Sequence, residues 1–124
     1  MVDDDARNVY AISGILEVNG MTVLDADNGR SGLDVLHAHP EIDLVLMDVM
    51  MPEMDGYSAI RAIRQTPQLA QLPVIAVTAK AMPGDRDKSL AAGADDYVTK
   101  PVDAADLVAA IRRSLAGKGG AGEV

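Results

Sequence analysis

Short apolar runs alternate along this chain with longer segments in which apolar residues recur every three or four positions. The short runs lie at 22–24, 44–47, 74–77 and 97–99, and each contains valine. Continuous apolar runs such as 44–47 and 74–77 are typical of parallel strands that are covered on both faces. The alternation therefore predicts an α/β domain with helices on both faces of a parallel sheet.

The periodic segments predict five helices. The first begins near residue 6 with Asp5 as its cap and ends at Asn19, the second stops before Pro40, and the fourth ends near Gly93. The last is capped by Asp103. The positions expected to face inward are Val9, Ile12, Leu16, Leu33, Leu36, Ile60, Ile63, Leu107, Val108, Ile111 and Leu115. Because four glycines stand in 117–122, we expect a domain over 1–116 and a flexible tail over 117–124.

Polar residues with chemical potential follow the predicted strands. Asp48 ends the run 44–47, Thr78 follows 74–77, and Lys100 follows 97–99. Asp3 and Asp4 stand where a further strand would end. The carboxyl ends of parallel strands meet at one edge of the sheet, where open α/β proteins bind ligands. The sequence therefore predicts a pocket that holds two or three carboxylates, a hydroxyl and an ammonium group.

This set of groups suits phosphoryl transfer. Clustered carboxylates repel one another unless a cation lies among them, and an all-oxygen site favours Mg²⁺. A further aspartate can then attack phosphorus, while a lysine and a hydroxyl hold the transferred oxygens. The same residues have ordinary structural roles too, since Asp4 or Asp5 can cap a helix and Thr78 suits a strand.

In combination, these motifs resemble those of response-regulator receiver domains over roughly residues 2 to 116. The resemblance implies a flavodoxin-like, doubly wound parallel sheet of five strands in the order 2-1-3-4-5, with helices on both faces. Only Met1 and Val2 precede Asp3, whereas a strand usually has about five residues. We therefore expect the first strand to be truncated, and interpret the sequence as a fragment of a longer protein.

The resemblance also implies a role for each residue of the pocket. Asp48 corresponds to the phosphoacceptor. Asp3 and Asp4 correspond to the acid pair that binds Mg²⁺ together with Asp48 and the backbone carbonyl of Met50, Asp3 acting mainly through water. Lys100 corresponds to the lysine that contacts the phosphoryl group.

A conformational switch is implied at two further positions. Thr78 corresponds to the hydroxyl residue that moves toward the phosphoryl group, and Tyr97 to an aromatic residue that then turns inward. The hypothesis is that both report phosphorylation to the face formed by the fourth helix, the fifth strand and the fifth helix. A tyrosine in a strand is otherwise a half-buried packing residue.

The segments Thr78–Met82 and Ala91–Tyr97 resemble receivers attached to bacterial hybrid sensor histidine kinases. The implied partner is a histidine kinase or a histidine phosphotransfer domain that donates a phosphoryl group from phosphohistidine. The implied protein is a signalling module in a two-component phosphorelay that catalyses only its own phosphorylation and dephosphorylation. The resemblance is also compatible with a homodimer of this domain.

Composition narrows the choice of function. The formal net charge of −8 over 124 residues argues against a direct nucleic-acid surface, which needs clustered lysine and arginine. Cysteine is absent, so disulfides and thiolate metal sites are excluded, which fits a cytoplasmic protein. No apolar run has the length of a membrane span, so we expect no membrane contact by this domain.

Two alternatives remain open from the sequence. A haloacid-dehalogenase-like phosphatase also attacks through an aspartate at a strand end, but it needs a second acid two residues later, where this chain has Met50. A degenerate receiver would bind partners without phosphorylation. That alternative predicts the loss of a site residue, and none is missing, although the truncated first strand keeps it open.

Overall fold

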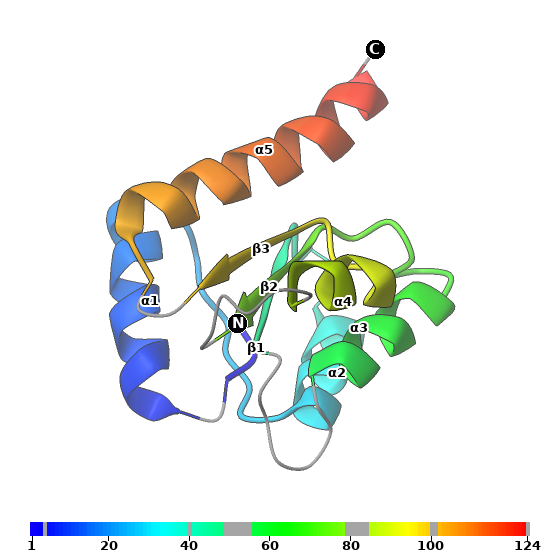
Figure 1. Cartoon of the computed structure of the whole chain (residues 1–124), viewed down its shortest axis with the longest axis horizontal. Coiled ribbons are helices and arrows are strands. Elements are labelled where there is room, and N and C mark those ends of the chain that lie inside the picture. Colours follow the sequence, from blue (N-terminus) through cyan, green and yellow to red (C-terminus); the bar gives the residue numbers. More distant parts are fainter. Residues whose placement is uncertain (4, 40, 49–55, 79–84, 100–101, 124) are drawn as a thin grey trace.

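The computed structural model describes residues 1–124 except 4, 40, 49–55, 79–84, 100–101 and 124. The chain begins with two helices, and from the second helix onward helices and strands alternate (Figure 1). In chain order they are α1 (Ala6–Val18), α2 (Gly29–Ala38), β1 (Val45–Asp48), α3 (Gly56–Gln65), β2 (Val74–Thr78), α4 (Asp85–Ala92), β3 (Asp96–Thr99) and α5 (Ala104–Glu123). The predicted α/β class and the five predicted helices are confirmed.

The strands form a parallel sheet in the order β1-β2-β3. Val45 pairs with Val74, and Ile75 pairs with Asp96. Val2 continues the sheet beyond β1 through isolated parallel bridges to Met47 and Ala26. The described part of the sheet therefore runs Ala26, Val2, β1, β2, β3, which agrees with the predicted order 2-1-3-4-5 and with a first strand reduced to a single bridging residue.

The predicted strand at 22–24 is wrong, since none of its residues is assigned to a strand. The Met1 ammonium donates to the Leu24 carbonyl at 2.6 Å, and the Asp3 N–H donates to the Ala26 carbonyl at 3.0 Å. On the side away from β1, the backbone of Met1–Asp3 pairs with Leu24 and Ala26. Pairing therefore lies two residues further along than the valine-containing run predicts.

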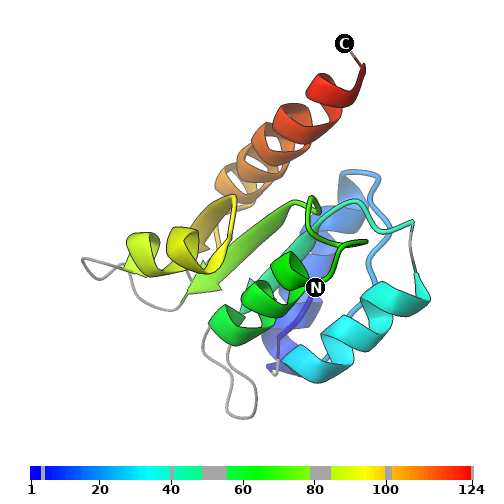
Figure 2. The same cartoon turned by 90° about the vertical axis from the view of Figure 1, so that its right-hand side faces the viewer.

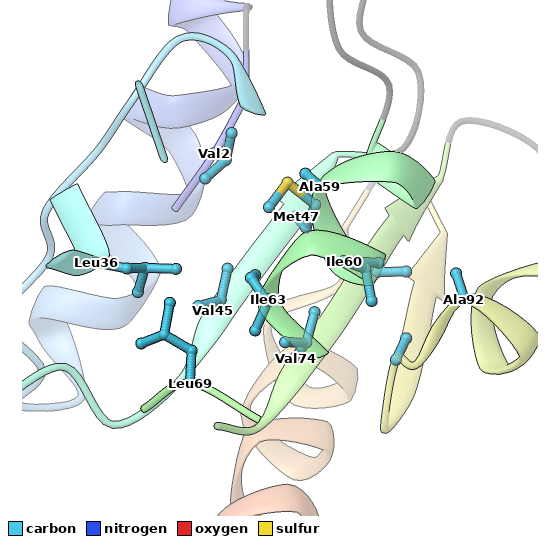
Figure 3. Packing of buried hydrophobic residues seen from close by; sticks show 12 residues of the cluster. Val2, Leu36, Val45, Met47, Ala59, Ile60, Ile63, Leu69, Val74 and Ala92 are labelled. Atoms are coloured by element: carbon cyan, nitrogen blue, oxygen red, sulfur yellow. The ribbon is translucent and has the colours of Figure 1, made fainter. Parts of the chain in front are cut away.

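Successive strand residues point to opposite sides of the sheet. Both faces of the sheet therefore carry apolar side chains, and helices cover both. On one face Val45, Met47 and Val74 pack with residues of α2, α3 and α4 (Figure 3). On the other face Leu46 and Ile75 pack with residues of α1 and α5. The buried residues of both clusters are aliphatic or methionine, which fits a chain without phenylalanine or tryptophan.

The predicted helix caps at Asp5 and Asp103 are confirmed. Asp5 Oδ1 accepts a hydrogen bond from the Arg7 N–H at 3.0 Å, and Asp103 Oδ1 accepts one from the Asp106 N–H at 3.1 Å. Such caps satisfy N–H groups that have no partner within the helix. They fix where α1 and α5 begin, and α1 begins just beyond the acid pair.

The prediction that Leu115 of α5 faces the core is wrong. Leu107 and Ile111 are buried, but Leu115 is 36% exposed. Leu115 borders a cavity of about 670 Å³, which Met1, Val23 and Leu44 also line. The helix passes the edge of the packed sheet at this point, so the helical spacing continues where the core beneath it does not.

Figures 1 and 2 both show the end of α5 projecting beyond the rest of the domain. The helix extends to Glu123, through the stretch that the glycines predict as a flexible tail. The boundary at residue 116 stays a prediction. No described helix has the length and hydropathy needed to cross a membrane.

Candidate functional site

Three of the predicted site residues are buried polar groups at the carboxyl ends of neighbouring strand segments. Asp3 and Asp48 are each 2% exposed, and Thr78 is 3% exposed. Burying a polar group is costly unless it is paired, and each of these side chains has interaction partners. Three such groups at one sheet edge mark this edge as the candidate site.

The backbone register brings Asp3 beside Asp48. The Val2 N–H donates to the Leu46 carbonyl at 2.8 Å, and the Asp48 N–H donates to the Val2 carbonyl at 2.9 Å. Val2 and Met47 both pack in the cluster on the α2–α4 face. Because side chains alternate along a strand, the following Asp3 and Asp48 lie on the opposite, α1-facing side of two segments about 4.8 Å apart.

The Asp3 carboxylate is held by the start of α1. Its Oδ1 accepts a hydrogen bond from the Asp5 N–H at 2.9 Å, and its Oδ2 accepts a short one from Asn8 Nδ2. Both of these donors are neutral groups, so the two bonds orient the carboxylate and add no positive charge beside it. Sequence reasoning missed Asn8. Its place in the first turn of a helix that follows the acid pair was the available signal.

Thr78 and Tyr97 lie on the same face of the sheet. Tyr97 pairs with Ala76 in the parallel register, and Thr78 is two residues beyond Ala76. Tyr97 is partly buried and packs against the cluster on the α2–α4 face. The two residues predicted to form a switch are therefore on adjacent strands and on one side.

The other predicted site residues, Asp4, Met50 and Lys100, lie outside the described residues. Within the described part of the chain, no group of three or more histidine, cysteine or acidic residues gathers around one point. The described pair Asp3 and Asp48 supplies two buried carboxylates on adjacent segments. Hard oxygen donors of this kind fit Mg²⁺, which needs only one or two protein carboxylates and keeps several waters.

Parallel strands covered by helices on both faces, with buried acids at their carboxyl ends, define a doubly wound α/β protein with an acidic strand-end pocket. Within that class, residues 1–112 match the model of the response regulator receiver domain. The chain belongs to this family and is a receiver domain of two-component signal transduction.

Individual relatives are of more than one kind. The transcriptional regulatory protein CpxR of Escherichia coli (strain K12) is 43% identical over 115 residues, which are 93% of this chain and 47% of CpxR. The signal transduction histidine-protein kinase BarA of the same strain is 41% identical over 118 residues, 95% of this chain and 13% of BarA. The chain thus spans less than half of the length of either relative.

A solved structure supports the fold. The signal receiver domain of a signal transduction histidine kinase from Syntrophus aciditrophicus shares 37% identity with a TM-score of 0.84, covering 94% of this chain and 87% of that one. The predicted similarity to receivers of histidine kinases is confirmed, together with an equally clear similarity to a transcriptional regulator. Family membership does not favour the phosphatase or the degenerate receiver as the interpretation of this chain.

Proposed function

We propose that Asp48 accepts a phosphoryl group from the phosphohistidine of a histidine kinase or histidine phosphotransfer domain, in a reaction that needs Mg²⁺. The observation that carries this proposal is the burial of Asp48 at the end of β1, directly beside Asp3. Receiver domains generally use Mg²⁺ and interact with such histidine proteins. A nucleophilic carboxylate paired with a second acid is the arrangement this chemistry needs.

In the proposed step, an Asp48 carboxylate oxygen forms a bond to phosphorus while the bond from phosphorus to the histidine nitrogen breaks. The imidazole leaves with the electron pair of that bond and takes up a proton, and an acyl phosphate remains on Asp48. Bound Mg²⁺ would offset the negative charge of the carboxylates and of the phosphoryl oxygens. Asp3, through water, and Asp4, Asp48 and the Met50 carbonyl would hold the ion.

Lys100 and Thr78 are proposed to hold the phosphoryl group once it is transferred. A lysine supplies a compact positive charge, and the Thr78 hydroxyl supplies a hydrogen-bond donor at the end of β2. Hydrolysis by water then returns Asp48 to its carboxylate. The domain would thus catalyse its own phosphorylation and dephosphorylation, on its own or within a longer kinase or regulator in the cytoplasm.

The proposed switch uses the shared face of Thr78 and Tyr97. When Thr78 moves toward the phosphoryl group, space opens on that face and Tyr97 turns inward, which changes the surface formed by α4, β3 and α5. Two states separated by a few kcal/mol are sufficient for this. A single Tyr97 rotamer with and without beryllofluoride, measured by crystallography or NMR, would exclude the switch.

The test of phosphoryl acceptance is intact-mass measurement after incubation with acetyl phosphate. We expect the mass of one phosphoryl group to appear with Mg²⁺ and to be absent with a chelator. Asp48→Asn removes the nucleophile with little change in volume, so this variant should stay folded and unlabelled. Asp43→Asn is the matched control, because Asp43 is an exposed acid just before the other end of β1. Normal labelling of Asp48→Asn would overturn the proposal.

A further inference from the structure

The first turn of α1 holds both oxygens of the Asp3 carboxylate. One oxygen accepts the backbone N–H of Asp5, which is itself the cap of α1. The other accepts the side-chain amide of Asn8, the third residue of the helix. Asn8 is partly buried, and its amide reaches back past the start of the helix to a residue five positions earlier.

The two donors differ in what a substitution can change. The Asp5 N–H belongs to the backbone and survives any side-chain replacement except proline. The Asn8 amide is a side-chain group, and its removal leaves Asp3 Oδ2 without that donor in a place where Asp3 is only 2% exposed. A buried carboxylate that loses a hydrogen bond reorients toward its remaining partners or takes up water.

We propose that Asn8 is a positioning residue of the metal site: its amide fixes the direction of the Asp3 carboxylate and thereby sets the affinity for Mg²⁺. The inference rests on the proposed function, in which Asp3 contributes to that site. Asn8 acts through Asp3 and does not contact the ion. Because an amide is neutral, Asn8 orients Asp3 without bringing a positive charge of its own to the site.

Removal of the amide should weaken Mg²⁺ binding. Partners of direct metal ligands typically contribute a factor of about 10–100 in metal affinity, and Asp3 acts through water, so Asn8→Ala should raise the Kd for Mg²⁺ about tenfold, at the lower end of that range. Phosphorylation by acetyl phosphate should return to nearly the original rate at saturating Mg²⁺, since Asn8 is not among the groups that react. The effect therefore appears in the Mg²⁺ concentration needed and not in the maximal rate.

A charged replacement should act differently. Asn8→Asp places a carboxylate against the Asp3 carboxylate, and like charges in contact repel. The metal-free variant should unfold at a lower temperature than the original protein. Added Mg²⁺ should raise its Tm by more than it raises the Tm of the original protein, because the ion relieves that repulsion.

The experiment measures the Mg²⁺ Kd by calorimetry and the Tm with and without Mg²⁺ for the original protein, Asn8→Ala and Asn8→Asp. Asn19→Ala is the control for α1 stability. Asn19 donates its side-chain amide to the Ile15 carbonyl at 2.8 Å at the opposite, exposed end of the same helix. This variant should lower the Tm without changing the Mg²⁺ Kd.

A folded Asn8→Ala with a Kd within twofold of the original would overturn the inference, as would an Asn19→Ala that weakens Mg²⁺ binding equally. If Asn8→Ala does not fold, the test rests on Asn8→Asp. A rise in the Tm of Asn8→Asp on adding Mg²⁺ that is no larger than the rise for the original protein would also overturn the inference. A failure of the proposed function looks different, because the unchanged protein would then neither bind Mg²⁺ nor take up a phosphoryl group.

Discussion

At the scale of single residues, the site depends on a few polar side chains whose burial forces them to be paired. Thr78 is an example, since a hydroxyl at 3% exposure on the last residue of β2 has partners even before any phosphoryl group arrives. A valine in its place would have nearly the same shape and would suit a strand as well. The hydroxyl is therefore the part of Thr78 that can respond to chemistry at Asp48.

We expect Thr78→Val to keep phosphorylation of Asp48 but to break its link to Tyr97. The methyl group fills the space of the hydroxyl but cannot donate a hydrogen bond to a phosphoryl oxygen. Residue 78 is then not drawn toward the phosphoryl group, and the strand keeps its position. The ¹⁹F resonance of fluorotyrosine at Tyr97 should shift with beryllofluoride in the original protein and in Thr78→Ser, and stay unshifted in Thr78→Val. An equal shift in all three proteins would show that Tyr97 does not respond through Thr78.

How far the sequence predicts the site also differs residue by residue. Asp48 and Thr78 were predictable because each ends a continuous apolar run, and that pattern alone places them at the sheet edge. Asn8 was not, because its contact with Asp3 depends on the angle at which α1 leaves the sheet. The place of Asn8 in the first turn after the acid pair makes it a candidate, but that angle also depends on packing beneath the helix, where Ile12 and Leu16 are buried against distant parts of the chain.

At the scale of elements, α2 approaches the Val2 bridge closely. A Cβ added at Gly32 of α2 would lie 2.6 Å from a methyl carbon of Val2. Real Cβ atoms do not come this close, so glycine is what allows the helix to pack there. Since Val2 precedes Asp3 and pairs with β1, the same contact also supports the position of Asp3.

Gly32→Ala should therefore destabilise the domain, although alanine favours helix by about 1 kcal/mol over glycine. Overpacking of about 1–3 kcal/mol outweighs that gain, which leaves a net loss of about 1 kcal/mol in the free energy of unfolding. Gly14→Ala in α1 is the matched control, because nothing lies within 4 Å of the added Cβ. Urea unfolding should show a gain for Gly14→Ala, and a gain for Gly32→Ala as well would refute the packing argument.

Element boundaries show where sequence patterns stop being sufficient. The starts of α1 and α5 were predictable from Asp5 and Asp103, because capping is a local interaction between neighbouring residues. The strand expected at 22–24 was not there, because pairing depends on which residues of the Met1–Asp3 segment lie opposite. Leu115 fits the helical spacing of α5, yet spacing cannot tell where the sheet beneath the helix ends.

At the scale of the whole molecule, Arg64 ties three parts of the chain together at the edge of the sheet opposite the site. Its guanidinium donates to the carbonyls of Gly93 at 2.8 Å and Leu72 at 2.6 Å, and to Asp95 Oδ2 at 2.9 Å. Asp95 Oδ2 also accepts the N–H of Val74, the first residue of β2, at 2.8 Å. One side chain thus connects α3 to both ends of the segment that contains β2 and α4.

Arg64→Met keeps the aliphatic stem but removes these donors, and should lower the free energy of unfolding by about 2 kcal/mol because carbonyls and a carboxylate lose a charged partner. Arg113→Met is the matched control. The Arg113 pair with Asp96 is also 2.9 Å long, but its arginine side chain is 65% exposed, so the loss should stay below about 1 kcal/mol. Equal losses in thermal or urea unfolding would contradict this account of Arg64.

The central claim is that Asp48 carries the phosphoryl group, and the most direct measurement is to locate that group chemically. Borohydride reduces an aspartyl phosphate to homoserine, and trypsin releases residues 31–61 as one peptide, which contains Asp34, Asp43, Asp48 and Asp55. After treatment with acetyl phosphate and Mg²⁺, fragmentation of this peptide should place homoserine at position 48 alone. Homoserine at another aspartate, or none in a protein that has gained phosphoryl mass, would contradict the assignment of Asp48.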